Sequence, residues 1–323
     1  MSPADELRTF AELRKRAGEA GPKRVGVVLA DDEVALTAMA LAYRSGLAFP
    51  VLIGEEKPIR ARAEFLGFFE LAAKAEFVSV DEGAAALAVR MAREGSIDIL
   101  MKGHLRTDQL LRPVLDKENG LRNGRLLSDV AFFETMHTGE PRLVGLSDGG
   151  LNVAPTLEQK KQIILNAIDV LHCLGMHCPR IAVMSAIEVV SEAVPSTLDA
   201  HALTEMGLAG DFGDAEVFGP LALDNALLHS AAKAKGISSR VAGNADCLIV
   251  PSVEAGNMLA KAIHVLAGLE FGHVVAGAKV PILIPSRAED AKTKVNNIAL
   301  GVLYANHSDA NEMALAGASE HSH

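Results

Sequence analysis

Short apolar runs alternate with longer segments of helical periodicity along almost the whole chain. Runs rich in β-branched residues predict strands at Arg24–Leu29, Val51–Ile53, Phe77–Val80, Ile97–Met101, Ile181–Met184, Cys247–Val250 and Pro281–Ile284. Helical patterns lie between or after them, at Asp32–Tyr43, Gly83–Arg93, Leu223–Lys235, Gly256–Leu266 and Lys292–Leu303. Because apolar strands that alternate with helices are typical of parallel sheets covered by helices, the pattern predicts an α/β fold.

The clearest single helix is predicted at Leu157–Leu174. Thr156 and Gln159 have the spacing of a capping box, in which each side chain accepts a hydrogen bond from the backbone of the other. The residues that form one apolar stripe along this segment are Ile163, Ile164, Ala167, Ile168 and Leu171. A helix with one buried face is therefore expected here.

The length of the chain, 323 residues, favours two domains rather than one core. The segment Pro141–Pro155 is rich in Gly and Pro and is the best candidate for a boundary. We expect residues 1–145 and 290–323 to form one α/β domain and residues 146–289 to form the other. Ligands of parallel α/β sheets bind beyond the carboxyl ends of strands, so the loops after those ends are the places to search.

The composition is that of a globular protein, with 49% hydrophobic and 22% charged residues. A formal net charge of −10 argues against nucleic acid or an anionic membrane as the main partner. The N-terminal segment lacks the apolar stretch of a signal peptide, and no segment approaches the roughly 20 apolar residues of a membrane span. Three cysteines, an odd number, favour a reducing cytoplasm over a disulfide framework.

Two motifs have chemical interpretations that their contexts disfavour. The stretch GLSDG at Gly145–Gly149 matches a hydrolase nucleophile elbow, but that elbow needs a helix directly after the serine, and Gly and Pro follow here. The stretch HCLGMHC at His172–Cys178 resembles a zinc site, but a buried helix end is the commoner explanation of such a stretch. No P-loop, dinucleotide-binding glycine motif or HExxH motif occurs, and we expect no bound metal.

Two basic loops follow predicted strands and are the strongest candidates for a site. The stretch MKGHLRTDQLLRPVL at Met101–Leu115 places a glycine turn before a predicted helix that Thr107 or Asp108 would cap and that contains Arg112. The second stretch, PSRAEDAKTKVNN, begins at Pro285 and places a hydroxyl and a guanidinium directly after a strand. Since arginine binds phosphate through two parallel hydrogen bonds, the two loops together predict a site for phosphate or a similar anion.

At these loops the sequence resembles the phosphate acyltransferases, the family of phosphate acetyltransferase and phosphate butyryltransferase. The resemblance covers nearly the whole chain. It rests on six blocks in the expected order, at Lys102–Arg122, Leu151–Ile168, Met184–Val190 with Pro195–Ala200, Gly219–Leu227, Asn244–Lys261 and Pro285–Ala305. The serine-containing and LDA-containing blocks look closer to the butyryl-type branch than to the acetyl-type one.

The resemblance implies two α/β domains similar to the isocitrate and isopropylmalate dehydrogenase class, with the active site in the cleft between them. It also implies the reaction acyl-CoA plus phosphate giving acyl phosphate plus CoA, with butyryl or acetyl as the acyl group. No cofactor is required in this interpretation, because coenzyme A is itself a substrate and product. We further expect a cytoplasmic homodimer, since two-fold dimers are the commonest oligomers.

Site residues are assigned from the matching blocks. Catalytic roles fall to Ser286 and Arg287, which stand where the family has a Ser-Arg pair, and to Arg112. Residues expected to bind substrate are Lys102, Gly103, Thr107, Thr293 and Asn257. Thr293 stands where acetyl-type members have an acidic residue that helps to deprotonate the CoA thiol, so the general base is left open between Glu289, Asp290 and no carboxylate at all.

Two other interpretations compete with this one. A dehydrogenase of the same fold class would require clustered aspartates for a metal and a nicotinamide site, and the sequence has neither. A non-catalytic acyl-CoA-binding protein is compatible with Thr293. Phosphate-dependent release of the CoA thiol would separate all three.

Overall fold

A computed structural model describes residues 6–80, 82–136, 139–286 and 289–320 of the chain. By their internal contacts the residues divide into two compact units. Unit 1 comprises Leu126–Phe271 together with the N-terminal segment up to Phe10, and unit 2 comprises Ala11–Arg125 together with the C-terminal segment from Gly272. Each unit is described separately below.

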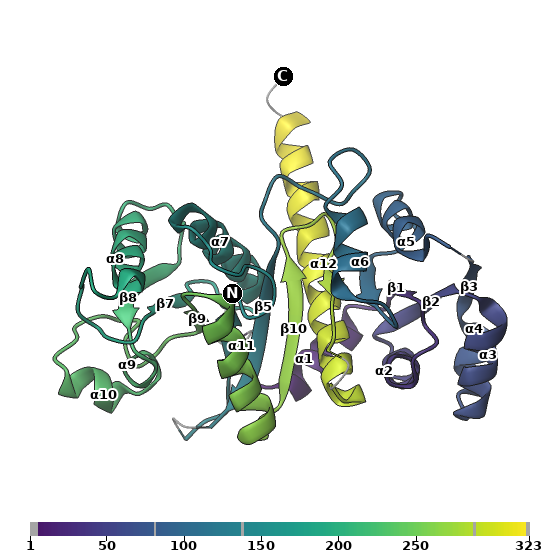
Figure 1. Ribbon diagram of the computed structural model, residues 1–323, viewed down its shortest axis with the longest axis horizontal. Coiled ribbons are helices and arrows are strands. Elements are labelled where there is room, and N and C mark those ends of the chain that lie inside the picture. Colours follow the sequence, from purple (N-terminus) through teal and green to yellow (C-terminus); the bar gives the residue numbers. More distant parts are fainter. Residues whose placement is uncertain (1–5, 81, 137–138, 287–288, 321–323) are drawn as a thin grey trace. The chain divides into compact units, whose positions relative to one another are not determined.

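Unit 2 carries the first four strands and the end of the chain (Figure 1). Its strands are β1 (Lys23–Val28), β2 (Ala48–Gly54), β3 (Glu76–Ser79), β4 (Ile99–Lys102), β10 (Phe271–Ala276) and β11 (Ile282–Leu283). Its helices are α1 (Phe10–Glu19), α2 (Glu33–Arg44), α3 (Glu56–Phe65), α4 (Phe69–Lys74), α5 (Ala84–Arg93), α6 (Thr107–Val114) and α12 (Ala291–Glu320). The strands have the order β3-β2-β1-β4-β11-β10, and all neighbouring pairs are parallel except β10 with β11.

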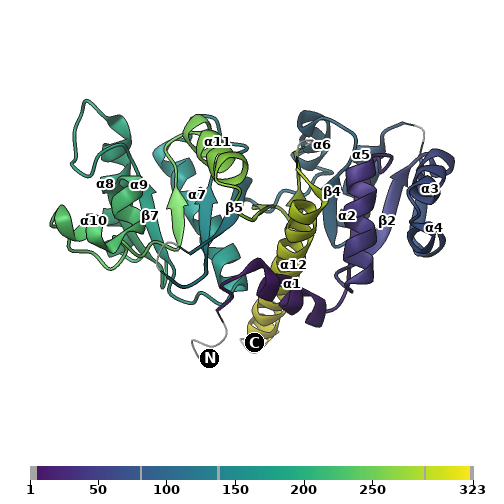
Figure 2. The same ribbon diagram turned by 90° about the horizontal axis from the view of Figure 1, so that it is seen from below.

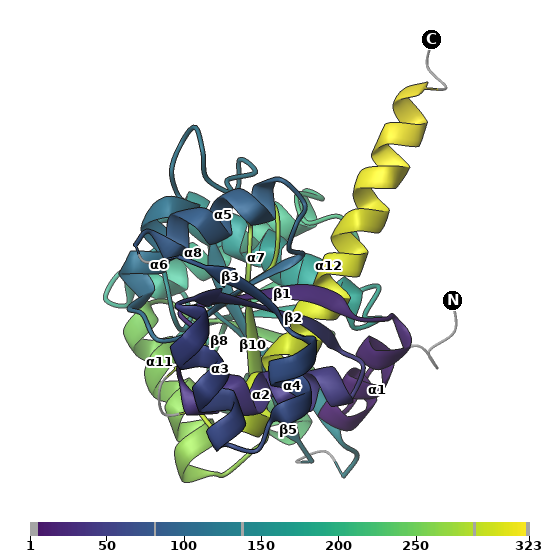
Figure 3. The same cartoon turned by 90° about the vertical axis from the view of Figure 1, so that its right-hand side faces the viewer.

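Helices cover both faces of the unit 2 strands. Helices α2 and α12 pack against each other on one face, whereas α5 and α6 pack together on the other (Figure 3). The central strands between them have long apolar segments, as in β1, where Val25, Val27 and Val28 are fully buried. Burial on both faces explains why these strands form continuous apolar runs in the sequence rather than an alternating pattern.

Unit 1 is built from five strands and five α-helices within the described residues. The strands are β5 (Ser128–Thr135), β6 (Arg142–Ser147), β7 (Arg180–Met184), β8 (Glu216–Leu221) and β9 (Cys247–Ile249). The helices are α7 (Leu157–Cys173), α8 (Pro195–Leu208), α9 (Leu223–Leu227), α10 (His229–Ala234) and α11 (Val253–Lys261), which continues as a π-helical turn at Ala262–Leu266. The strand order is β5-β6-β9-β7-β8, antiparallel for β5 with β6 and parallel for the rest.

The helices of unit 1 also lie on two faces, with α7 and α8 on one and α9, α10 and α11 on the other (Figure 2). One core cluster joins Leu146 of β6 and Leu248 of β9 to residues of the α9–α11 side, such as Ala226 and Ile263. On the other face α7 buries Ile163, Ile164, Ala167, Ile168 and Leu171, the apolar stripe that the sequence predicts.

The predicted α/β fold with a mainly parallel strand arrangement is confirmed. The capping box of α7 is confirmed as well, because Gln159 N donates to Thr156 Oγ1 at 3.3 Å and Thr156 N donates to Gln159 Oε1 at 2.9 Å. None of the helices in the described part of the chain combines the length and the apolar character that a membrane span requires.

The predicted boundary segment, Pro141–Pro155, contains a strand. Residues Arg142–Ser147 form β6, which is buried and pairs with both β5 and β9. Its glycine, Gly145, is required by close packing, since a Cβ there would lie 2.9 Å from Cys247 Sγ. The glycine therefore marks strand packing and not a linker, and the contacts divide the chain after Arg125 and after Phe271 rather than near residues 145 and 289.

Candidate anion site at the carboxyl edge of unit 2

Three adjacent parallel strands of unit 2 end at the same edge. In the register of β1 with β4, Val28 lies opposite Lys102, and in that of β4 with β11, Met101 lies opposite Leu283. Because parallel strands point the same way, the loops after β1, β4 and β11 all leave at this edge. We call residues 29–32, 103–106, 284–286 and 289–290, with the first turns of α6 and α12, the carboxyl edge of unit 2.

The loops after β1 and β4 are tied together by the backbone. Gly103 N donates to Val28 O at 3.0 Å, and His104 N donates to Leu29 O at 2.8 Å. A Cβ on Gly103 would lie 2.3 Å from Leu29 O, so only glycine permits this approach. Leu29 itself has a φ of 55°, a left-handed conformation that is costly for a branched side chain. Such strained residues concentrate at functional sites, which favours this edge as the site.

Arg112 is an exposed residue in the last turn of α6, the helix that follows β4. The helix begins at Thr107, with Arg106 as its N-cap, so the expectation that Thr107 or Asp108 caps the helix is wrong. Arg106 N donates to Gln109 Oε1 at 2.9 Å, and Arg106 Nη2 lies 2.8 Å from Asp108 Oδ2. The hydrogen bond from Arg106 holds the pKa of Asp108 below its usual value, with a smaller contribution from the charge of Arg112. Arg106 thus has a partner, whereas no hydrogen bond or ion pair of the Arg112 side chain occurs among the described residues.

Two of the predicted substrate-binding residues of unit 2 are buried. Lys102, at the end of β4, is 6% exposed, and its Nζ donates to Leu105 O at 3.4 Å. Thr293, in the first turn of α12, is 3% exposed.

The loop after β11 holds Ser286 through a buried carboxylate. Glu289 Oε1 accepts a hydrogen bond from Ser286 N at 2.9 Å and lies 3.4 Å from His273 Nε2. Glu289 Oε2 accepts from Asn297 Nδ2 at 3.2 Å. Burial alone would raise the pKa of Glu289, but the neighbouring His273 imidazole and these hydrogen bonds outweigh burial and hold the pKa below its usual value. Arg287, which follows Ser286, lies outside the described residues.

These contacts bear on the identity of a general base. Glu289 has a lowered pKa and uses both oxygens to hold the loop, so it is a weak base in a structural position. Asp290 accepts a hydrogen bond from Thr293 N at 2.8 Å and caps α12. Both carboxylates that the sequence leaves open as bases are therefore engaged in fixing the loop and the helix.

Of the predicted site residues, Asn257 lies in unit 1. Its Nδ2 donates to Gly149 O at 3.2 Å, which links α11 to the loop after β6. The carboxylate of Asp148 organises that loop by accepting from Gly150 N at 2.8 Å and Leu151 N at 3.0 Å. Burial and the nearby Asp129 raise the pKa of Asp148. Asn257 thus lies in α11 and contacts a glycine-rich turn at the carboxyl end of β6.

The two motifs that the sequence disfavoured have structural roles. Ser147 of GLSDG is fully buried, and its hydroxyl donates to Asp129 O at 2.8 Å. In HCLGMHC, His172 Nε2 lies 3.2 Å from Asp214 Oδ1 and Cys173 Sγ donates to Asp169 O at 3.0 Å. No cluster of three or more potential metal ligands occurs among the described residues, and all three cysteines are free thiols.

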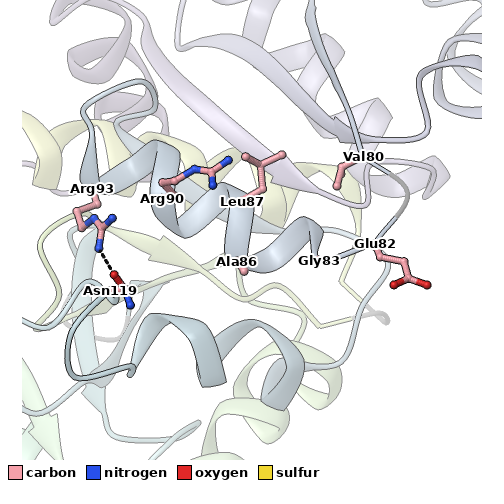
Figure 4. Close-up of a pocket in the computed structure, with 8 residues that line it drawn as sticks. All are labelled: Val80, Glu82, Gly83, Ala86, Leu87, Arg90, Arg93 and Asn119. Atoms are coloured by element: carbon pink, nitrogen blue, oxygen red, sulfur yellow. Dashed lines mark hydrogen bonds between the residues drawn. The ribbon is translucent and has the colours of Figure 1, made fainter.

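A separate pocket of about 440 Å³ lies along α5 (Figure 4). Its lining includes Arg90 and Arg93, and Arg93 Nη1 donates to Asn119 Oδ1 at 3.0 Å. The apolar side chains of Val80 and Leu87 also contribute to it. Both arginines are exposed on a helix surface, and none of the predicted site residues lines this pocket. It is therefore distinct from the carboxyl edge of unit 2.

Sequence reasoning missed three residues of this edge. Asp31 and Asp32 follow β1, and Lys294 lies in the first turn of α12. His104 Nδ1 lies 3.4 Å from Asp31 Oδ2, and Lys294 Nζ lies 3.4 Å from Asp32 Oδ2. The adjacent acids directly after an apolar strand were the available signal, because polar residues at that place face the ligand side of parallel sheets.

Comparisons with known proteins agree on one family. The family described as Phosphate acetyl/butaryl transferase matches residues 70–302. The phosphate acetyltransferase of Rickettsia felis is 40% identical over 97% of this chain and 89% of its own length. The phosphate butyryltransferase of Clostridium acetobutylicum is 36% identical over 93% of this chain and 99% of its own length. The crystal structure of a branched-chain phosphotransacylase from Enterococcus faecalis superposes with a TM-score of 0.78 at 27% identity, covering 88% of this chain and 99% of that one.

Proposed function

The chain belongs to the phosphate acetyl/butyryl transferase family and is a phosphate acyltransferase, and we propose that it transfers a short acyl group between CoA and inorganic phosphate at the carboxyl edge of unit 2. In this reaction a phosphate oxygen forms a bond to the thioester carbonyl carbon, and the bond from that carbon to sulfur breaks. Acyl phosphate and CoA are the products. The two competing interpretations, a dehydrogenase and a non-catalytic binding protein, are not favoured by the family.

The observation that carries this proposal is the adjacency of β4 and β11. Lys102 ends β4 and Ser286 follows β11, so the two residues are far apart in the sequence, yet they lie at the carboxyl ends of two paired parallel strands of one unit. Arg112 lies in α6, the helix that follows β4. Phosphate carries two negative charges near neutral pH, and the attack on a thioester develops a third on the carbonyl oxygen. An edge that gathers basic side chains and a hydroxyl is suited to hold both.

Six of the eight predicted site residues have a role in this proposal. Arg112 and Arg287 bind phosphate and hold it in position for attack, because the planar guanidinium matches the spacing of two phosphate oxygens. Ser286 donates a hydrogen bond to the carbonyl oxygen or to phosphate. Lys102, Gly103 and Thr107 line the phosphate side. A direct transfer needs no protein nucleophile, and none of the three cysteines lies in the loops of this edge.

Three further expectations accompany this function. CoA enters as a substrate and leaves as a product, so the reaction balances without an added cofactor. The enzyme works as a homodimer, since two-fold symmetric dimers are the commonest oligomers. It works in the cytoplasm, a compartment compatible with its free thiols.

The test is phosphate-dependent release of the CoA thiol. Purified protein is mixed with butyryl-CoA or acetyl-CoA, and free thiol is measured with a thiol reagent in the presence and absence of phosphate. We expect release only with phosphate, together with formation of acyl phosphate. Binding of acyl-CoA without any release would support the non-catalytic interpretation and overturn the proposal.

A further inference from the structure

A buried lysine that the proposed mechanism does not use lies beside the loop of Ser286. Lys294 is in the first turn of α12, and its side chain is 4% exposed. Its Nζ lies 3.4 Å from Asp32 Oδ2, a contact longer than a typical charged hydrogen bond. The same Oδ2 accepts a hydrogen bond from Ala35 N at 3.0 Å, because Asp32 is also the N-cap of α2.

This ammonium is incompletely satisfied. A lysine ammonium has three N–H donors, and the contact with Asp32 is the one polar contact of Lys294 Nζ within the described ranges of the chain. The lysine side chain is more than nine-tenths buried, and the oxygen that it contacts, Asp32 Oδ2, also caps α2. A buried cation with so few acceptors is costly to maintain. Such an arrangement is expected where an anion binds during the working cycle of the protein.

The surroundings place this cation at the carboxyl edge of unit 2. Asp32 is in the loop after β1, and the preceding Asp31 lies 3.4 Å from His104, in the loop after β4. Lys294 belongs to the helix that follows the Ser286 loop after β11. The contact of Lys294 with Asp32 therefore connects the segment after β11 to the loop after β1. The neighbouring Asp31 contacts the loop after β4 through His104.

A cation close to the sulfur would assist the reaction. When the bond from carbon to sulfur breaks, its electron pair remains on sulfur, and the proton that phosphate brought ends on the CoA thiol. Between these events the sulfur carries a negative charge. Thr293 carries no charge to assist, and Glu289 and Asp290 are acids engaged in holding the loop and α12. We infer that Lys294 binds the CoA sulfur and offsets the charge of the thiolate, an inference that rests on the proposed function.

The first test separates the sulfur from the rest of CoA. Equilibrium binding of CoA and of desulfo-CoA, which lacks the sulfur, is measured at pH 8 by calorimetry for the wild type and for Lys294→Met. We expect the substitution to weaken CoA binding by about ten- to a hundredfold, in line with the loss of a charged hydrogen bond. Binding of desulfo-CoA should change by less than about twofold, since this ligand has nothing for the ammonium to contact.

The second test follows the thiol itself. Ultraviolet absorbance of the thiolate reports the pKa of bound CoA, which in the wild type should lie below the pKa of free CoA measured in the same buffer. Lys294→Met should return it toward that value, and Lys294→Arg should restore a lowered pKa because the charge is kept. Lys292→Met is the matched control, since Lys292 is an exposed lysine two positions earlier on the same helix.

Two outcomes would overturn the inference. If Lys294→Met weakens the binding of CoA and of desulfo-CoA equally, or changes the binding of neither, the lysine acts only on the fold. If Lys294→Met fails to fold, the wild type still decides, because a bound thiol with an unchanged pKa excludes a cation at sulfur. Failure of the proposed function would look different, since the wild type would then release no thiol from acyl-CoA when phosphate is added.

Discussion

The substitution Glu289→Gln tests whether one buried carboxylate holds the Ser286 loop. Glutamine has the same shape as glutamate but replaces one acceptor oxygen by an NH₂ group. Asn297 Oδ1 already accepts from His273 N at 2.7 Å, so the NH₂ group of Asn297 must face residue 289. Ser286 N faces it on the other side. A glutamine can therefore satisfy one of these two donors and must oppose the other with its own NH₂ group.

The magnitude follows from these contacts. A buried donor left without an acceptor costs about 1–3 kcal/mol, and loss of the charge beside His273 adds to this. Because the Glu289 side chain is 11% exposed, solvent compensates little. We expect a total loss of stability of about 2–4 kcal/mol at pH 7.

The effect should depend on pH in a defined direction. The folded pKa of Glu289 lies below the ordinary value of 4.5, so the charged form is stabilised by folding. Its contribution is fully present above about 4.5 and is lost as the pH falls through the lowered folded pKa. The difference in melting temperature between wild type and Glu289→Gln should therefore be largest at neutral pH and should begin to close once the pH falls past 4.5.

Thermal denaturation between about pH 7 and pH 3 measures this, with kcat/KM at pH 7 as a second readout. Glu158→Gln is the control, because Glu158 is an exposed acid in the first turn of α7. It should change neither quantity appreciably. A Glu289→Gln protein with wild-type stability, or with a deficit that is the same at every pH, would refute the assigned network.

Three other predictions concern substrate and loop geometry. Arg112→Ala should lower kcat/KM for phosphate by about thirty- to a thousandfold, whereas Arg106→Ala should have little effect because Asp108 already binds Arg106. Steady-state kinetics with varied phosphate measure both effects, and equal losses would show that Arg112 is wrongly assigned to phosphate. Butyryl-CoA should be preferred to acetyl-CoA by roughly tenfold, since each buried methylene contributes about 0.8 kcal/mol, and kcat/KM across chain lengths would contradict this if acetyl-CoA were clearly better. Gly103→Ala should destabilise the protein by about 1–3 kcal/mol, because its Cβ would meet Leu29 O, and chemical denaturation showing no loss would count against the observed loop.

The strand and helix pattern was predictable because burial on both faces leaves a local signature. The strands β1, β7 and β9 are predicted from their short apolar runs, which are rich in β-branched residues. The sequence pattern does not predict the antiparallel pair β5 and β6, because Gly145 looks like a turn residue. In the structure this position is glycine because Cys247 packs against it. A glycine selected by a contact with a distant strand cannot be distinguished in the sequence from one selected by a turn.

The acyl branch illustrates another limit. Blocks of the sequence favour butyryl-type members, yet the relatives of both names match at similar identity, 40% for an acetyltransferase and 36% for a butyryltransferase. Overall identity is set mostly by the core, which both branches share. Acyl preference depends on the few side chains around one short chain, so it stays a prediction that the kinetic comparison must decide.

The carboxyl edge of unit 2 shows why loop residues were predicted better than their partners. Lys102 ends a strand, Ser286 follows one and Arg112 lies in the helix after one, and each of these positions can be read locally. Asp32 and Lys294 are 262 residues apart, and they meet because β11 is placed beside β4, next to β1. No local pattern encodes that order, which is fixed by the pairing of strands contributed from both ends of the chain. The partner of a buried charge in a parallel sheet is therefore best sought among the residues that follow the neighbouring strands in space.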